Sequence, residues 1–386
     1  MKKTVHYFCF GVDSIIKDKL TYFPSAQPKI RYIIDTLKRN GYTTNMVSSC
    51  SIKKNGFFKR QSYSIDHMEK HIYFSSFKSS NKLINKISIL FSFIQFIFYI
   101  VFIVKKGDLI LIYHSLYYLK PIRILKKIKK FKFILEVEEI YSYLSEENRK
   151  FENEELELIN SASAYLLVND LLDEKIPLGS KKAIISYGNY NVPKLLRYEN
   201  FEYENYSNVV YAGVIENIRK AAFMAVESAR YLNGNFRVHI LGFGNEEDIF
   251  NLKEKIKQIN SELNTEMVIF HGSMSGDQYH KFLQACNIAL SCHIYDENMR
   301  ASADYTFPSK IITYMANGLN VVSTDIRSVR KSALGKYITF FSENSPMEMA
   351  KAILSVSNVT QVNMRDVIKD LDKHFKIELG KLLEEI

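Results

Sequence analysis

Residues able to bind an anion gather in the second half of the chain, at Phe307-Pro308-Ser309-Lys310. A proline is well suited to the first position of a helix, because its missing N–H would have no partner there. The amides of Ser309 and Lys310 then lie in the first turn, where helical N–H groups have no acceptor. Free amides, the positive helix end and the Lys310 ammonium favour a phosphate group. The stretch therefore predicts phosphate binding by Pro308, Ser309 and Lys310.

Two glycine-containing loops in the same half add to this pattern. Gly213 ends an apolar run six residues before Arg219 and Lys220, and Gly242-Phe-Gly244 ends the next run. We expect the glycines to let a ligand approach the backbone and the two cations to neutralise it. Each loop alone is equally typical of a tight turn. The dinucleotide pattern Gly-x-Gly-x-x-Gly is missing, which disfavours NAD.

The first half offers side chains for acid–base chemistry. His114 follows the apolar run Leu109–Tyr113, and Glu136, Glu138 and Glu139 follow or end another. A carboxylate here could serve as a base for an acceptor hydroxyl or orient it, and Glu138 is our preferred member. His114 fits a catalytic and a structural role equally well. No His, Asp and Glu set has metal-ligand spacing, so we predict neither a metal nor another cofactor.

The elements that would position these side chains alternate regularly. Continuous apolar runs separated by helical stretches predict parallel strands covered by helices on both faces, an α/β fold. The alternation restarts after a charged segment near residue 200 and yields six strands in the second half. We therefore predict two Rossmann-like domains, residues 1–200 and 201–363, followed by a helix over residues 364–386.

The amino-acid composition limits the classes of protein to which the chain can belong. The 386 residues are 47% hydrophobic and 24% charged, which excludes a disordered chain, a coiled coil and a collagen-like repeat. The four cysteines have no CxxC spacing, so we expect reduced thiols in a cytoplasmic protein. No signal peptide is expected at the beginning of the sequence, since the first apolar run stops at Gly11.

Charge differs between the two halves. Residues 1–196 carry 31 Lys and Arg against 18 Asp and Glu, whereas residues 197–386 carry 21 against 24. The lysine-rich segment Lys120–Lys132 alternates cations with aliphatic residues. An anionic membrane surface and a solvated basic face both fit this half. Nucleic acid fits less well, because no recognition module accompanies the charge.

One uncharged segment, Ile87–Val104, is long enough to span a membrane. Its polar residues form one helical stripe: Ser88, Ser92, Gln95 and Tyr99. Lysines flank both ends, and a strand of the same sheet follows at once. These features argue against a span and leave two alternatives, a buried crossover helix or a helix partly embedded in the membrane interface.

The stretch from Tyr305 to Val322, TyrThrPheProSerLysIleIleThrTyrMetAlaAsnGlyLeuAsnValVal, resembles a family motif. It is similar to the donor-binding loop and helix of bacterial GT-B glycosyltransferases of the group 1/family 4 kind. Upstream, "VVYAGVIENIRKA", "VHILGFG" and "VIFHGSM" occur in the order of that family. The resemblance covers roughly residues 208–325.

The resemblance implies a GT-B fold with two facing Rossmann-like domains, a central cleft and a C-terminal helix that crosses back. It implies a nucleotide-diphosphate sugar as donor, without a metal, and retention of anomeric configuration. By similarity, Arg219 and Lys220 would neutralise the diphosphate, His271-Gly272 would adjoin the base, and Pro308, Ser309 and Lys310 would hold the distal phosphate and the sugar.

The sequence departs from the family at one point. The paired glutamates, spaced Glu-x7-Glu, fall on Tyr305 and Thr313, so their contacts to sugar and ribose are missing in the usual form. Asp304 lies one residue from the first position and could replace it.

We therefore predict a glycosyltransferase that extends a glycan, such as a polyprenyl-linked one, in cell-surface polysaccharide synthesis such as that of a capsule or exopolysaccharide. We expect it at the inner face of the plasma membrane as a cytoplasmic, peripheral protein. The alternatives are a catalytically silent GT-B subunit and a nucleotide-sugar epimerase.

Overall fold

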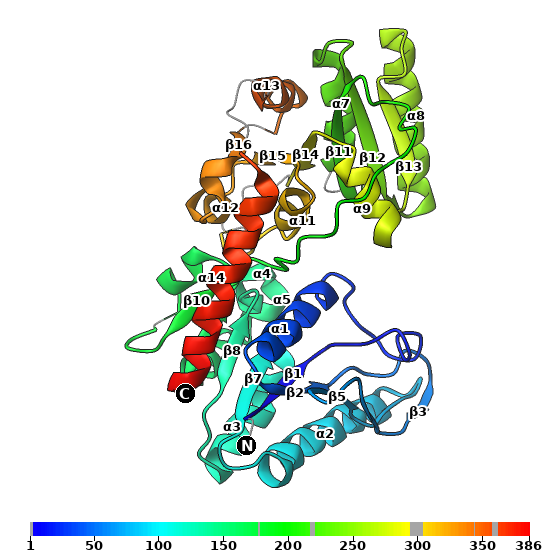
Figure 1. The fold of residues 1–386 in the computed structure, drawn as a ribbon. Helices are drawn as coiled ribbons and strands as arrows, with labels where there is room; N and C mark the ends of the chain where they lie inside the picture. The colour runs from blue at the N-terminus through cyan, green and yellow to red at the C-terminus, as the bar shows by residue number, and fades with distance from the viewer. Residues whose placement is uncertain (1–2, 177, 217–220, 294–303, 343, 357–361) are drawn as a thin grey trace. The chain divides into compact units, whose positions relative to one another are not determined.

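The computed structural model describes residues 3–176, 178–216, 221–293, 304–342, 344–356 and 362–386 (Figure 1). It divides into two compact units. The first comprises Met1–Asn189 together with Lys373–Ile386, and the second comprises Tyr190–Asp372. Cys9, Cys50, Cys286 and Cys292 are buried and form no disulfide.

The first unit is built on an eight-stranded sheet in the order β10-β9-β8-β7-β1-β2-β5-β4. All neighbouring strands are parallel except β4 and β5, and a separate antiparallel pair joins β3 to β6. The strands are β1 (Thr4–Cys9), β2 (Thr43–Ser48), β3 (Gly56–Phe58), β4 (Gln61–Ser64), β5 (Glu69–Tyr73), β6 (Ser76–Lys78), β7 (Leu109–Tyr113), β8 (Ile134–Val137), β9 (Ala164–Leu167) and β10 (Ala183–Ile185).

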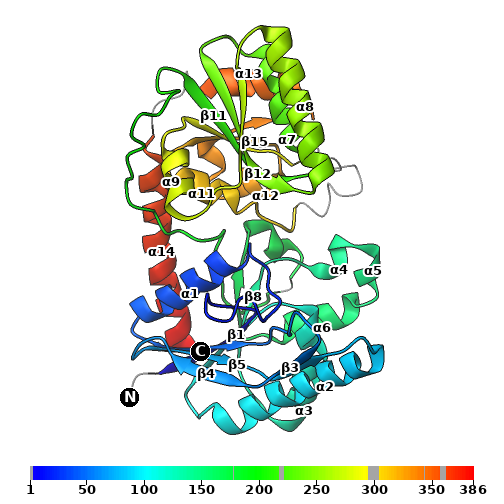
Figure 2. The same cartoon turned by 90° about the vertical axis from the view of Figure 1, so that its right-hand side faces the viewer.

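Helices cover both faces of this sheet (Figures 1 and 2). One face carries α1 (Gln27–Arg39) and the end of α14 (Met364–Glu385), which meet where the Tyr32 and Phe375 rings lie 5.7 Å apart. The other face carries α2 (Lys82–Phe98), which continues as the π-helix η1 (Tyr99–Ile103), and α3 (Leu119–Ile128). Shorter helices follow: η2 (Leu116–Tyr118), α4 (Tyr141–Leu144), α5 (Glu146–Arg149), α6 (Glu152–Ser161) and η3 (Asp170–Glu174).

The second unit contains a six-stranded, fully parallel sheet in the order β13-β12-β11-β14-β15-β16. Its strands are β11 (Ser207–Ile215), β12 (Phe236–Gly244), β13 (Val268–Gly272), β14 (Ile288–Ser291), β15 (Asn320–Thr324) and β16 (Ile338–Phe341). The core lies between the sheet and three helices, α7 (Ala221–Ser228), α8 (Glu246–Leu263) and α13 (Pro346–Val356). The remaining helices are η4 (Ala229–Tyr231), α9 (Gly276–Gln284), α11 (Lys310–Ala316), α12 (Arg327–Lys331) and η5 (Gly335–Tyr337).

These observations confirm the predicted α/β class, the six strands of the second half and the helix that begins at Met364. The helix contributes to both units, since Lys373–Ile386 belongs to the first and the preceding residues to the second. The interpretation of Ile87–Val104 as a buried crossover helix is wrong. Only 22% of the most apolar window of Lys82–Ile103 is buried, and the burial is concentrated on the polar stripe, because that stripe faces the protein.

Candidate functional site

The carboxyl ends of β11 and β12 form the backbone of the candidate donor site. Gly213 pairs with Gly242, and Ile215 pairs with Gly244. A Cβ atom at Gly242 would overlap the carbonyl oxygen of Gly213, and one at Gly244 would overlap that of Ile215. The two glycines are therefore needed where the strands approach each other, which brings Gly213, Gly242 and Gly244 together at one edge of the sheet.

Lys310 lies at the same edge. A Cβ atom at Gly213 would overlap the Lys310 Nζ, so the ammonium rests directly against the backbone of β11. The same Nζ lies 5.1 Å from the centre of the Tyr211 ring. Gly213 and Lys310, two residues that the sequence singled out separately, thus form one constellation with a positive charge at a strand end.

The helix that carries Lys310 is fixed to β11 by hydrogen bonds. The Tyr314 hydroxyl accepts from the Ala212 amide and donates to the Ala212 carbonyl, both at 3.1 Å. At the other end of α11, Arg365 Nη1 donates to the Ala316 carbonyl at 3.1 Å. Pro308 is buried and Ser309 exposed immediately before α11 begins at Lys310. These contacts hold the Lys310 backbone at a set distance from Gly213.

Asp304, Tyr305 and Thr313 lie among the described residues, whereas two other predicted donor-site residues do not. Asp304 Oδ2 lies 3.6 Å from Arg327 Nη1, and Tyr305 is half-buried beside it. Thr313 is half-buried on α11. Arg219 and Lys220 lie outside the described residues, so their predicted role at the diphosphate stays a prediction.

Thr313→Glu tests whether this position corresponds to a ribose-binding glutamate. Because Thr313 is only half-buried, a longer side chain has room to extend, and we expect the variant to fold with unchanged or tighter donor binding. Thermal midpoint and donor affinity measure the two parts. Unfolding or a large loss of affinity would contradict this placement.

His271 is held in a neutral cluster. Its Nε2 lies 2.9 Å from His239 Nδ1, and His239 Nε2 lies 2.9 Å from Asn208 Oδ1. Asn208 Nδ2 donates to two carbonyls, which leaves its oxygen to accept from His239. Burial, with the nearby His271 and Arg237, lowers the pKa of His239 to about 3. The His271 ring therefore has a fixed orientation, and Gly272 follows it with φ +71° at the end of β13.

The carboxylates of the first unit differ strongly in environment. Glu136 on β8 is fully buried and accepts a hydrogen bond from the Tyr7 hydroxyl. Burial, opposed by Lys29 and reinforced by Glu138, raises the pKa of Glu136 to about 8. Glu138 forms an ion pair with Lys29, whose Nζ also donates to the Ser186 carbonyl at 2.7 Å. Glu136 is thus held neutral, whereas Glu138 is held beside a cation.

Glu139 is the member of this set that sequence reasoning did not select. Burial and the charge of Glu138 raise the pKa of Glu139 to about 7, near the value that suits a general base at neutral pH. The signal was its position directly after Glu138, but only the structure separates the two. Tyr7 and Lys29, which partner Glu136 and Glu138, come from distant parts of the sequence and were missed.

His114 is fully buried and supports the loop that carries these acids. Its Nδ1 donates to the Glu139 carbonyl at 2.9 Å. Its Nε2 lies 3.3 Å from Glu155 Oε1, without hydrogen-bond alignment, and burial lowers the pKa of His114. Glu155 in turn accepts from the amides of Tyr141 and Ser142 at 2.7 Å. The structure therefore makes His114 a buried support of the loop at Glu139, whereas the Glu138 side chain is held separately by Lys29.

Glu136→Gln tests the neutral state of this buried acid. Between pH 4.5, the ordinary pKa of a glutamate, and about pH 8, Glu136 is protonated in the native chain but ionised in the unfolded chain. Glu136 therefore costs stability as the pH rises through this window. Glutamine keeps a carbonyl for Tyr7 and cannot ionise, so the stability of the variant relative to the original should increase with pH.

Buried histidines with a lowered pKa make the native chain more stable as the pH rises, which would mask the effect of Glu136. The measured quantity is therefore the difference in urea midpoint between the variant and the original at several pH values. Glu254→Gln, an exposed change on α8, serves as the control and should give a constant difference. A constant difference for Glu136→Gln as well would contradict the assignment.

Within the described part of the chain, no three His, Cys, Asp or Glu side chains lie close enough to hold a metal ion. The absence of a required metal or cofactor remains a prediction.

Comparison with protein families identifies the second unit. Residues 206–358 match the family Glycosyl transferases group 1. No curated protein matches the chain in sequence.

Solved structures match the complete chain in fold. "Trehalose-6-phosphate from E. coli bound with UDP-2-fluoro glucose" has a TM-score of 0.72 and 10% identity, and the match covers 100% of this chain and 99% of that one. An alpha,alpha-trehalose-phosphate synthase from Burkholderia xenovorans in complex with glucose-6-phosphate has a TM-score of 0.67, 7% identity and 99% and 100% coverage. Sucrose-phosphate synthase from Thermosynechococcus elongatus has a TM-score of 0.65, 13% identity and 100% and 99% coverage.

At these identities the solved structures show the fold alone, and the family match concerns residues 206–358. The chain therefore has the fold of GT-B glycosyltransferases, and the family match of its second unit supports a nucleotide-sugar glycosyltransferase. Its residues 206–358 belong to the group 1 family, as the motif at residues 305–322 indicated.

Proposed function

We propose that the protein transfers its sugar to a glycan carried on a lipid, such as a polyprenyl diphosphate, at the cytoplasmic face of an anionic membrane. The first unit would dock on that surface as a peripheral domain, and transfer would retain the anomeric configuration. Cell-surface polysaccharide synthesis is the process that needs such a step. One observation supports the proposal above the others, the outward apolar face of α2 and η1.

The apolar side of this helix is turned to solvent along its whole length. Relative exposures are 51% for Ile87, 56% for Leu90, 55% for Ile94, 51% for Phe98 and 69% for Phe102. Soluble proteins rarely leave so continuous an apolar surface uncovered unless it binds something. A bilayer would cover this surface if the helix lay flat in the headgroup region with its apolar face toward the acyl chains.

The polar side of the helix contacts the rest of the first unit through hydrogen bonds. Gln95 accepts from the Ser75 amide at 2.9 Å and donates to its carbonyl at 2.8 Å. Ser88 accepts from the Phe77 amide at 3.1 Å, and the Tyr99 hydroxyl lies 3.1 Å from His6 Nδ1. The helix is therefore attached to the first unit by the face that a soluble helix would expose.

Lys82–Ile103 is also the one helix of the described residues that is long and apolar enough to cross a membrane. We favour docking over crossing because crossing would break the hydrogen bonds of the polar stripe. Basic residues add electrostatic attraction, on the order of 1 kcal/mol for each cation near an anionic surface.

The similar structures suggest a different acceptor, since two of them are named as synthases of sugar phosphates. This likeness concerns the fold alone. A silent subunit and an epimerase remain alternatives because Tyr305 and Thr313 replace the glutamate pair. An acceptor panel separates these cases: we expect transfer to a lipid-linked glycan in vesicles, and transfer to glucose-6-phosphate instead would contradict the proposal. Sugar isomerisation without an acceptor would indicate an epimerase.

Leu90→Glu tests the docking face. Replacing an inserted leucine by a charge should weaken vesicle binding by at least ~10-fold, because burying such a side chain contributes about 1.5–3 kcal/mol. Co-sedimentation with anionic and neutral vesicles across a salt series measures this loss. Phe250→Glu, an equally exposed change on α8 of the second unit, is the matched control and should bind as the original does. Equal binding by both variants would contradict docking through α2.

A further inference from the structure

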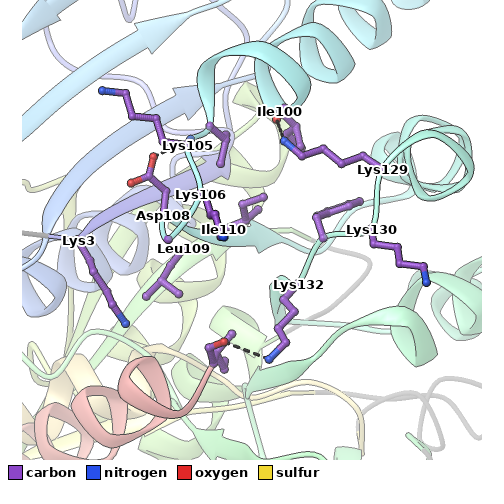
Figure 3. A pocket seen from close by; sticks show the side chains of 14 residues that line it. Lys3, Ile100, Lys105, Lys106, Asp108, Leu109, Ile110, Lys129, Lys130 and Lys132 are labelled. Carbon is purple, nitrogen blue, oxygen red and sulfur yellow. Dashed lines mark hydrogen bonds between the residues drawn. The ribbon is translucent and has the colours of Figure 1, made fainter.

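A lysine-lined pocket lies in the first unit at the amino-terminal end of β7 (Figure 3). Its volume is about 370 Å³. Three segments contribute its cations, the residue before β1, the turn between η1 and β7, and the loop after α3. The six lysines are Lys3, Lys105, Lys106, Lys129, Lys130 and Lys132.

The pocket contains little negative charge to balance these lysines. Asp108 is the one acidic side chain in its described lining. Its Oδ2 already accepts from the Lys105 amide at 2.9 Å and lies 3.1 Å from His6 Nε2. Lys129 donates to the Ile100 carbonyl at 3.1 Å, and this neutral acceptor leaves its charge uncompensated. Lys132 donates to an oxygen of Ile386, the last residue of the sequence, at 3.2 Å. A dianionic or monoanionic phosphate fits such a concentration of cations.

Apolar side chains surround the same place. The η1 helix leads into the pocket through Ile100 and Val104, and its Phe102 and Ile103 are 69% and 41% exposed. The α3 helix, which packs beside α2, ends at the pocket with Ile128 61% exposed. Apolar side chains adjoining a set of lysines match the two layers of a lipid surface, acyl chains and headgroup phosphates.

We propose that this pocket binds the phosphate of an anionic phospholipid headgroup while the apolar face of α2 and η1 lies in the bilayer. The inference rests on the proposed membrane docking and adds a defined site to it. The bound lipid is an anchor and not the acceptor. The pocket lies at the amino end of β7 and His114 follows the carboxyl end, so the strand separates them by roughly 15 Å at ~3.3 Å per residue.

The test compares phosphate with charge alone. Vesicles contain either phosphatidate or a fatty acid, with mole fractions adjusted to the same zeta potential because a phosphate monoester carries more charge than a carboxylate. The surface charge is then matched, and only one lipid carries a phosphate monoester. We expect the original protein to bind the phosphatidate vesicles several-fold more tightly. Lys106→Gln/Lys132→Gln should abolish this preference, because it removes two charges from different sides of the pocket.

Lys82→Gln/Lys86→Gln is the matched control, since it removes the same charge from exposed lysines at the opposite end of α2. It should weaken binding to both vesicles by roughly five-fold per lysine and keep the preference for phosphatidate. Circular dichroism and thermal midpoints establish that all variants fold. Loss of the preference in both double variants, or no preference in the original, would overturn the pocket and indicate diffuse surface charge.

Two further arms separate the remaining outcomes. Glycerol phosphate titrated without vesicles should bind weakly, and saturation as tight as that by phosphatidate vesicles would identify a free phosphate as the ligand and overturn the lipid assignment. Failure of the original protein to bind any vesicle would contradict the proposed docking itself. Vesicle binding that ignores the pocket variant would contradict only this inference.

Discussion

Lys310→Met should reduce kcat/KM for the nucleotide-sugar donor by roughly 10- to 150-fold, because one charged hydrogen bond to a phosphate contributes about 1.5–3 kcal/mol. Lys310 sits where its ammonium lies against the carboxyl end of β11, and methionine keeps most of the side-chain volume without the charge. The fold should be retained, since Tyr314 and Arg365 hold α11 independently of Lys310. Donor titrations followed by initial rates measure the effect.

The matched control is Lys257→Met, an exposed lysine on α8 of the same unit. It changes the net charge equally and should leave the rate unchanged. Equal rates for Lys310→Met and the original enzyme would place the diphosphate elsewhere.

Gly213→Ala should reduce kcat/KM for the donor by a similar factor, because it displaces the Lys310 ammonium. The added Cβ occupies the position of the Lys310 Nζ and comes within 2.9 Å of the Tyr211 hydroxyl. The end of a lysine side chain can swing away cheaply, so we expect the strand to persist and the ammonium to be displaced. Donor affinity should fall while the thermal midpoint changes little.

The double variant Gly213→Ala/Lys310→Met distinguishes displacement from an independent effect. If Gly213 acts by positioning Lys310, the two losses should not add, and the double variant should resemble Lys310→Met alone. Additive losses would show that the glycine serves the ligand directly, for example by permitting close approach to the β11 backbone.

Most of the parallel strands were predictable because their signal is local. Leu109–Tyr113 and Ile134–Val137 are almost entirely buried, and such strands appear as continuous apolar runs. The strands β3, β4, β5, β6 and β10 were missed. β3, β4 and β6 are short and pair with antiparallel partners, β10 has only three residues, and β5 begins with two charged residues. Gln61–Ser64, for example, contains no aliphatic residue that periodicity could detect.

The candidate site was predictable where one motif carries it. Pro308, Ser309 and Lys310 are contiguous, and Gly213 marks a strand end. The relation between Lys310 and Gly213 depends on how α11 packs against β11, and nothing local encodes it. Likewise, the sequence placed Glu136, Glu138 and Glu139 together but could not rank them. Their difference arises from Tyr7 and Lys29, which are more than 100 residues away along the chain.

The α2 segment shows a further limit. Its apolar composition is typical of a core helix, and only the tertiary hydrogen bonds of Gln95 and Ser88 reveal that the polar side faces inward. A hydropathy pattern shows that one face of a helix is apolar and the other is polar. Only the contacts within the fold show which of the two faces is buried against the protein.

The most direct test of the central claim is a donor screen. The purified protein is incubated with UDP- and GDP-sugars and vesicles carrying lipid-linked glycans, and released nucleoside diphosphate and extended glycan are measured together. A nucleotide-sugar glycosyltransferase should release one diphosphate for each sugar added, with one donor preferred and with the rate reduced in Lys310→Met. No donor binding, no release and no extended glycan with any pair would contradict the claim and favour a catalytically silent GT-B subunit.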